Sequence, residues 1–258
     1  MTDIATFNAW IDSRNNNLKS PTSFLSVTGM YWLTETPQRI DGLTGEFSAV
    51  DHTVTVANSS IGDQTFTLEP RAELTFDLDG IKVELASRAG QIIVRPRDPK
   101  NPMFDAFEGV STWAFDPAFV VQATLEAFDE PRDVVVDSIV EGHKMSSVSP
   151  GELVFELGGK QNRLTAFARE GSQDLSIYFR DETSGKEAYG TGRSVAALHN
   201  ADGSYTINFN QAGNFPCAYT DFATCPIPPR ENHLSIAINA GERMPALRNT
   251  FEGISAQH

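Results

Sequence analysis

From about residue 39 onward, apolar and polar residues alternate along short runs, a pattern typical of half-buried β-strands. The runs HTVTVA, QTFTLE, ELTFDL, IKVELAS and QIIVRPR are separated by turn-forming segments. Between two of them lies Asp79-Gly80, a strong hairpin signal because both residues tolerate the positive φ of a type I′ turn. The pattern predicts a small β module over residues 38–95.

The chain before this module has a different periodicity. Apolar residues recur at helical spacing near the start, at Ile4, Phe7, Trp10 and Ile11. Either Thr2 or Asp3 is available as the N-cap, and the run Asn15-Asn16-Asn17 is expected to end the helix. We therefore expect an N-terminal helical segment within residues 1–37, although 21–35 fits a short helix or a strand.

A proline-rich run, RPRDPKNP, follows the small module. Proline fixes φ and lacks an N–H donor, so we expect a rigid connector over residues 96–117. Alternation then resumes in VVVDSIV, ELVFEL, RLTAFARE, DLSIYFRD and YTINFN, with tight turns between them. Residues 118–258 are predicted to form a larger antiparallel β domain that carries the candidate site.

The complete pattern predicts a mainly β protein. Its antiparallel sheets would form a sandwich or a partly open barrel in two β-rich halves, with a short N-terminal helix.

The segment from Tyr205 to Glu242 is the richest in candidate chemistry. A loop at 211–232 holds both cysteines, several prolines and the triplet Arg230-Glu231-Asn232. Ordered polar loops on a rigid β scaffold commonly carry function. We expect a ligand pocket where strand 205–210 meets this loop. The predicted ligand-binding residues are Arg193, Asn208, Asn210, Asn214, Phe215, Tyr219, Glu231 and Asn232.

Each type of side chain has a role in this prediction, and some have structural alternatives. Arg193 would grip a carboxylate or phosphate, or instead form a salt bridge with Asp181, Glu182 or Glu187. Asn208 and Asn210 share one strand face, which would either line a polar cavity or face solvent. The two aromatic residues would form apolar walls.

Cys217, Cys225 and Glu231 are the candidates for catalysis. A cysteine nucleophile needs a base, and neither His199 nor His233 lies at a spacing that indicates pairing. The alternative for the cysteines is packing in a proline-clamped loop, and for the glutamate it is loop anchoring.

The histidines do not indicate a metal site. The five histidines (His52, His143, His199, His233 and His258) have no ligand spacing, so we expect neither a metal nor a cofactor.

Charge narrows the set of partners. The 258-residue chain has a formal net charge of −14 and a pI near 4.7, which disfavours nucleic acids and anionic membranes. The N-terminus has no basic region followed by an apolar run, and no window approaches a membrane span. We therefore expect a cytoplasmic protein, in which a permanent disulfide is disfavoured. The sequence leaves the oligomeric state open.

The second half of the chain contains the motifs FRDETSGKEAYGTGR, NFNQAGNFPCAYTDFATCPIPPREN and INAGE. Together they resemble one bacterial family, catalogued as domain of unknown function 1684, and RPRDPKNPMFDAFEGVSTWAFDP shows a looser likeness to it. The matching positions in the second motif are Phe209, Asn210, Asn214, Pro216, Cys217, Ala218, Tyr219, Cys225, Pro226, Pro228, Glu231 and Asn232. The resemblance implies a shared fold and the location of a site, but no reaction.

This sequence also departs from the family pattern. Asn208 replaces an acid, Gln211 an arginine and Gly213 a tyrosine, while His233 replaces an arginine. An acid–arginine pair, if the family uses one there, is therefore missing from this chain.

The leading functional hypothesis is binding of a small polar or anionic molecule without a cofactor. One alternative is a cofactor-independent hydrolase that uses Cys217 or a carboxylate. Another is a protein-interaction module in which aromatic residues mark a partner surface, namely Phe104, Phe107, Trp113 and Phe115.

Overall fold

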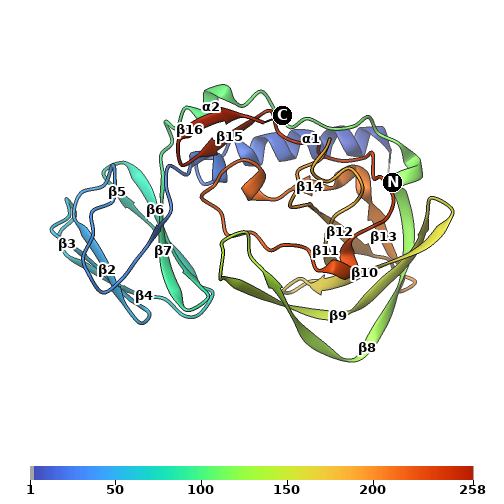
Figure 1. Cartoon of the computed structure of the whole chain (residues 1–258), viewed down its shortest axis with the longest axis horizontal. Coiled ribbons are helices and arrows are strands. Elements are labelled where there is room, and N and C mark those ends of the chain that lie inside the picture. Colours follow the sequence, from blue (N-terminus) through green and yellow to red (C-terminus); the bar gives the residue numbers. More distant parts are fainter. Residues whose placement is uncertain (1–2, 258) are drawn as a thin grey trace.

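The computed structural model describes residues 3–257 and shows two β lobes side by side (Figure 1). The small lobe contains the strands of residues 31–97, and the larger lobe contains those from residue 120 to 214. Helix α1 (Ile4–Leu18) runs along the larger lobe, and the hairpin β15 (Leu247–Thr250) and β16 (Gly253–Ala256) lies near the junction. The prediction of a mainly β, antiparallel protein with a short N-terminal helix is confirmed.

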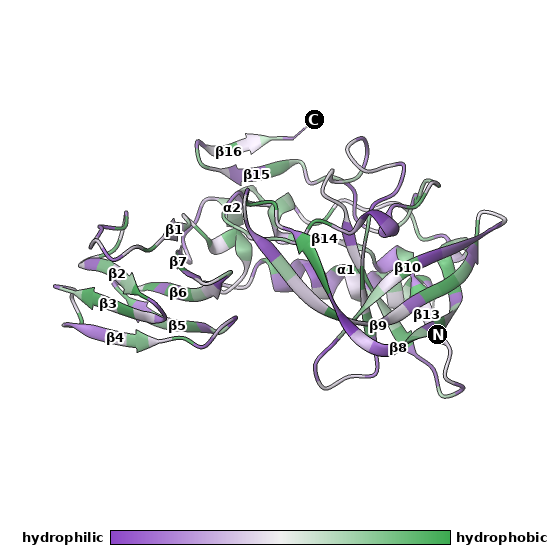
Figure 2. Ribbon diagram, turned by 60° about the horizontal axis from the view of Figure 1, so that its bottom comes forward, coloured by the Kyte–Doolittle hydropathy of each residue, from purple (hydrophilic) through white to green (hydrophobic). Residues whose placement is uncertain are grey.

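The small lobe is a sandwich of two sheets. One sheet has the order β1-β7-β6-β5, and the other has the order β2-β3-β4. Their bounds are β1 (Tyr31–Trp32), β2 (Glu46–Val50), β3 (Thr53–Ala57), β4 (Gln64–Thr67), β5 (Glu73–Leu78), β6 (Ile81–Arg88) and β7 (Gln91–Arg97). Buried residues of both sheets, such as Phe47, Val54 and Leu85, form one core, and Figure 2 shows the hydrophobic stretch of β3 within these stacked strands.

Local sequence signals explain two features of this lobe. The predicted Asp79-Gly80 hairpin is confirmed, with φ values of 56° and 80° and Leu78 opposite Ile81. The proline-rich run, in contrast, begins inside the sheet, because Pro96 lies in β7 and pairs with Val83 of β6. The short helix α2 (Met103–Ala106) follows it.

The larger lobe is a closed barrel. Strands β8 to β13 pair in sequence order, and β13 also pairs with β8, so the meander closes into a ring. Their bounds are β8 (Val120–Asp137), β9 (Lys144–Leu157), β10 (Lys160–Ala168), β11 (Leu175–Phe179), β12 (Arg193–His199) and β13 (Tyr205–Asn208). Inward-facing residues such as Leu153, Ile177 and Ile207 form its core.

The loops contain several short elements. They are η1 (Phe24–Ser26), η2 (Pro117–Phe119), η3 (Phe209–Gln211), β14 (Gly213–Asn214), η4 (Pro216–Ala218) and η5 (Arg230–Asn232). Strand β14 pairs with the start of β12, which places loop 211–232 against the barrel.

Helix α1 is capped by Asp3, whose carboxylate accepts a hydrogen bond of 2.9 Å from the backbone N–H of Thr6. The alternative cap, Thr2, lies outside the described residues. The helix continues through the asparagine run and ends at Leu18. Phe7 packs against Phe115, whereas Ile4 is exposed. Within residues 3–257 no helix is both long and apolar enough to cross a bilayer.

Strands β8 and β9 extend beyond the barrel as a ribbon that reaches the small lobe. Their register shifts between Ala127 and Arg132. At the far end, the His143 Nε2 lies 2.9 Å from the Gln91 side chain, and its ring lies 4.4 Å from that of Trp32. The ribbon thus holds the lobes together and brings the start of β9 against the β6–β7 hairpin.

Candidate functional site

Glu242 anchors the predicted loop to helix α1. Its carboxylate is fully buried and accepts hydrogen bonds from Arg14 Nε at 2.6 Å, Asn214 N at 2.7 Å and the Tyr219 hydroxyl at 2.9 Å. Burial and the charge of Glu242 raise the pKa of Tyr219 well above its usual value. Because one donor lies in α1 and two lie in loop 211–232, this carboxylate fixes the loop relative to the helix.

Arg193 is buried, and its two Nη atoms are bound by protein groups, whereas its Nε lacks a partner among the described residues. Its Nη2 donates to Asp181 at 2.8 Å and to the Ile238 carbonyl at 2.9 Å, and its Nη1 donates to the carbonyls of Ala240 and Glu242. The salt bridge to Asp181, which the sequence left open as an alternative, is therefore present. Burial lowers the pKa of Arg193 despite this carboxylate. Arg193 holds the segment that carries Glu242.

Two of the predicted asparagines bind each other and the backbone. Strand β13 ends at Asn208, so Asn210 lies in η3 and does not continue the strand face. The Asn210 carboxamide exchanges two hydrogen bonds of 2.9 Å with the backbone of Asp116 and donates to the Asn208 side chain at 3.0 Å. Both side chains are buried, and they tie the end of β13 to the segment before β8.

Asn232 has a similar structural role. Its carboxamide accepts from Thr165 N at 2.7 Å and donates to the carbonyls of Thr165 and Tyr178 at 2.9 and 2.8 Å. It therefore pins the end of loop 211–232 to strands β10 and β11. Its neighbour Glu231 is exposed on η5.

A cavity of about 360 Å³ lies between α1, the barrel and β14. We call it the arginine cavity. It is lined by Trp10, Arg14, Arg169, Ser176, Tyr178, Ser194, Val195, Ala196, Gln211, Gly213 and Asn214. Of the residues predicted to bind ligand, Asn214 is the one that lines it.

The polar groups of this cavity include two arginines and the carboxamide of Asn214. Arg14 donates from Nη2 to the Asn214 carbonyl at 2.8 Å, which together with Glu242 fixes its guanidinium. Arg169 is exposed and forms no ion pair within residues 3–257. The Asn214 Oδ1 is buried and lacks a partner among the described residues. None of the described lining residues is acidic.

Arg14 and Arg169 were not among the residues predicted from sequence. A signal for Arg14 was available, because it follows Phe7 by seven residues and Trp10 by four, which places a charge on the buried helix face. Arg169, Ser176 and Ser194 come from separate strands and turns, and the pairing of β10, β11 and β12 brings them together.

The two cysteines lie side by side but away from a base. The backbone N–H of Cys217 donates to Cys225 Sγ at 3.3 Å, and both residues are buried without a disulfide. A hydrogen bond from the Cys225 thiol lowers the pKa of Cys217 and correspondingly raises that of Cys225, which burial raises further. Within residues 3–257 no hydrogen bond joins either thiol to a histidine.

The predicted aromatic walls line two other cavities. Phe215 and Cys225 line one of about 280 Å³, which we call the middle cavity, together with Phe24, Tyr178 and Ser194. Tyr219 lines another of about 420 Å³ beside α2. The predicted site residues thus form several separate groups.

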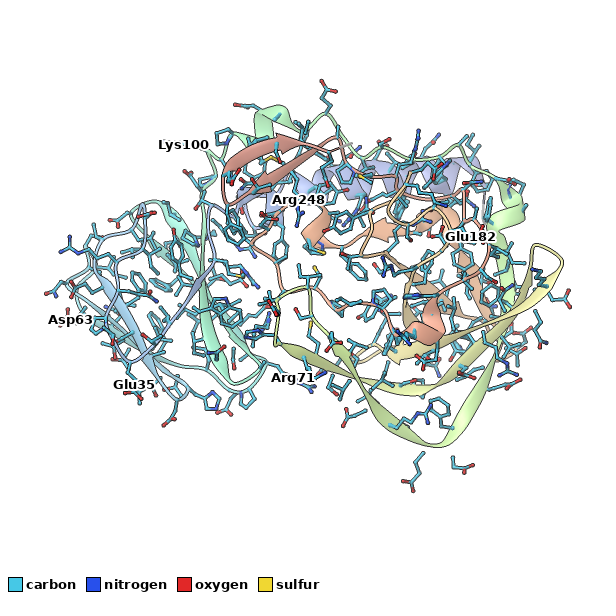
Figure 3. All side chains as sticks on the ribbon, viewed as in Figure 1. Glu35, Asp63, Arg71, Lys100, Glu182 and Arg248 are labelled. Atoms are coloured by element: carbon cyan, nitrogen blue, oxygen red, sulfur yellow. The ribbon has the colours of Figure 1, made fainter. Side chains whose placement is uncertain are left out.

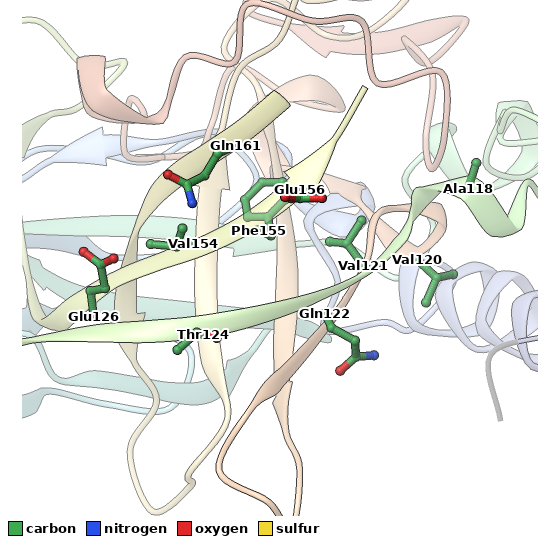
Figure 4. Close-up of a pocket in the computed structure, with 10 residues that line it drawn as sticks. All are labelled: Ala118, Val120, Val121, Gln122, Thr124, Glu126, Val154, Phe155, Glu156 and Gln161. Atoms are coloured by element: carbon green, nitrogen blue, oxygen red, sulfur yellow. The ribbon is translucent and has the colours of Figure 1, made fainter. Parts of the chain in front are cut away.

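A larger hollow of about 680 Å³ lies on β8, β9 and the start of β10 (Figure 4). It contains the carboxylates of Glu126 and Glu156 but no residue of loop 211–232. Glu126 is already bound by Arg163 at 2.5 Å. Within residues 3–257, no three histidine, cysteine or acidic side chains gather closely enough to hold a metal ion.

The fold and cavity define a two-lobed, antiparallel β protein with an arginine-lined pocket beside its barrel. The chain belongs to the family described as "Protein of unknown function (DUF1684)", whose sequence model matches residues 105–243. The resemblance found from the sequence motifs is therefore confirmed.

Two further comparisons add no activity. Among solved structures, the chain is similar to the NMR structure of an uncharacterized protein of Haloarcula marismortui. The identity is 34%, the match covers 56% of this chain and 80% of the other, and the TM-score is 0.46. No curated protein matches the chain.

Proposed function

We propose that the protein binds a small anionic metabolite in the arginine cavity. The observation that carries the proposal is the presence of Arg14 and Arg169 in one cavity whose described lining has no carboxylate, within a chain of net charge −14. Arg14 is paired with Glu242, which is not among the lining residues, and Arg169 has no ion pair within residues 3–257. A cavity lined by positive side chains raises the local concentration of small anions, even on a protein whose net charge is negative.

The size and lining of the cavity support a small molecule. A volume of about 360 Å³ falls at the lower end of metabolite pockets. A guanidinium offers paired donors that match a carboxylate or phosphate, and Arg14 is held in place for this by Glu242. Ser176, Ser194 and Gln211 supply neutral hydrogen-bonding groups, and Trp10 supplies an apolar wall.

Titration calorimetry against carboxylates, phosphates and their uncharged analogues tests this proposal. Arg169→Gln is the informative variant, because this exposed side chain has no structural partner within residues 3–257 and its loss should leave folding unchanged. We expect at least tenfold weaker binding, since a hydrogen bond to a charged group contributes about 1.5–3 kcal/mol.

Arg163→Gln is the matched control, because Arg163 is also exposed on the barrel but pairs with Glu126 outside the cavity. Equal affinities of Arg169→Gln and the unchanged protein for every bound anion would refute the proposal.

We also propose a cytoplasmic location. The adjacent, unpaired thiols of Cys217 and Cys225 support it, since such a pair persists in a reducing compartment. Rapid alkylation of cell extracts under denaturing conditions would test it, and recovery of both cysteines as a disulfide would argue for another compartment.

A further inference from the structure

A further cavity, of about 540 Å³, lies where the two lobes meet. The turn before β5, the β6–β7 hairpin and the start of β9 all contribute to it. Figure 3 labels Arg71 on the edge of the small lobe that faces the ribbon of the larger lobe. We call this the junction cavity. It shares no described lining residue with the arginine cavity.

Three cations from three separate elements line the junction cavity. They are Arg71, Arg88 and Lys144, and no acidic residue is among the described lining. Arg88 pairs with Glu73, and Lys144 pairs with Asp137 at 2.7 Å. Arg71 has no ion pair within residues 3–257. Burial lowers the pKa of Arg88, and the nearby charge of Arg95 lowers it further.

His52 also lines the junction cavity. Its Nδ1 is buried without a hydrogen-bond partner among the described residues, which is unusual because buried polar atoms are nearly always satisfied. Ser87 and Ser146 add hydroxyl groups to the same wall.

The remaining walls are apolar. Pro70, Ala89 and Met145 line the cavity, and methionine adapts its shape to varied apolar groups. Arg71 itself adopts φ 68°, a left-handed conformation that non-glycine residues seldom occupy and that often marks functional positions. Cations and apolar walls together suit a ligand with both an anionic group and an apolar body.

We infer that the junction cavity is a second ligand site, which binds an organic anion made of an aromatic or acyl body and one sulfonate, phosphate or carboxylate group. The anionic group lies among Arg71, Arg88 and Lys144, and the apolar body lies against Met145 and Pro70. Because the cations come from both lobes, the bound anion also bridges the lobes. This site is independent of the proposed function of the arginine cavity.

Anilinonaphthalene sulfonate is the probe for the experiment, with phenylnaphthylamine, which lacks only the sulfonate, as its uncharged analogue. Fluorescence titration of the full chain measures both affinities. We expect Arg71→Gln and Lys144→Gln each to weaken binding of the sulfonate about tenfold, as the loss of a charged hydrogen bond predicts. Both variants should bind the uncharged analogue as the unchanged protein does.

Two controls separate this site from other binding. Lys160→Gln removes an exposed cation from the distant β9–β10 turn, and Arg169→Gln removes one from the arginine cavity, so both should retain full affinity for the sulfonate. Both Arg71 and Lys144 are exposed, so their variants should fold, and circular dichroism of each variant checks this. Unchanged sulfonate affinity in Arg71→Gln and Lys144→Gln, or no binding of the sulfonate at all, would overturn the inference.

Discussion

Replacement of Arg193 by methionine distinguishes a structural arginine from a ligand-binding one. The sequence suggested an anion-gripping role, whereas the structure shows its guanidinium bound to Asp181 and to carbonyls of the segment 238–242. Methionine keeps much of the side-chain volume but removes every one of these donors. It also leaves the carboxylate of Asp181, which is buried, without its cationic partner.

The expected loss of stability follows from the burial of this pair. Breaking a buried ion pair by removing one partner costs about 3–5 kcal/mol. Asp181 keeps two hydrogen bonds from Thr183, which limits the loss to this range. For a chain of this size the change corresponds to a decrease in Tm of about 6–20 °C.

Urea unfolding followed by tryptophan fluorescence measures the change. Arg163→Met is the matched control, because the Arg163–Glu126 pair is exposed and should contribute under about 1 kcal/mol. A loss below about 1 kcal/mol in Arg193→Met, similar to that of the control, would refute the structural role of this arginine and revive the ligand-binding one.

Three further predictions concern the loop and its anchor. Tyr219→Phe should lose about 1–3 kcal/mol at neutral pH, because the buried Glu242 carboxylate loses a donor. The pKa of Tyr219 is raised in the folded state, so the stabilisation from its hydroxyl is complete below about pH 10 and is lost as the pH rises further. The stability of the unchanged protein should therefore fall more steeply above pH 10 than that of the variant. Parallel curves of stability against pH would contradict this. In thermal unfolding, Gly241→Ala should destabilise the protein far more than Gly62→Ala. Both glycines have φ near 80°, so the backbone strain of the two substitutions is similar. A Cβ at Gly241, however, would lie 2.5 Å from the Ala212 carbonyl oxygen, whereas a Cβ at Gly62 would meet no atom within 4 Å. Both cysteine thiols should react with an aromatic disulfide reagent much more slowly in the folded protein than after denaturation, because both are buried; rapid native labelling of one thiol at neutral pH would instead favour the hydrolase hypothesis.

The strands and the hairpin turn were predictable because they depend on residues close together in the chain. Alternation at every second position places one side of a strand in a core whatever the partner strand is. Asp79-Gly80 sets its turn through its own φ preferences, and the spacing of Phe7 and Trp10 sets the helix in the same way. Family membership could also be predicted, because the sequence contains long motifs that resemble those of the family.

The site depended on contacts that no local pattern encodes. Arg14 and Glu242 are separated by 228 positions, and Arg193 binds carbonyls more than 40 residues away. Asn210 was placed on a strand face by its spacing, but the strand ends two residues earlier, and the side chain binds Asp116 instead.

The sequence by itself determined the alternating strands, the N-terminal helix, the antiparallel β class and the family, because these follow from neighbouring residues and motifs. Only the tertiary structure decided which charges are neutralised and which remain available to a ligand. Packing of the segment 238–242 against the barrel surrounds Arg193 with carbonyls, whereas Arg169 and Arg71 line cavities and have no carboxylate partner in the residues described. The reason is that the partner of a charge is set by the path of the whole chain rather than by its neighbours in sequence.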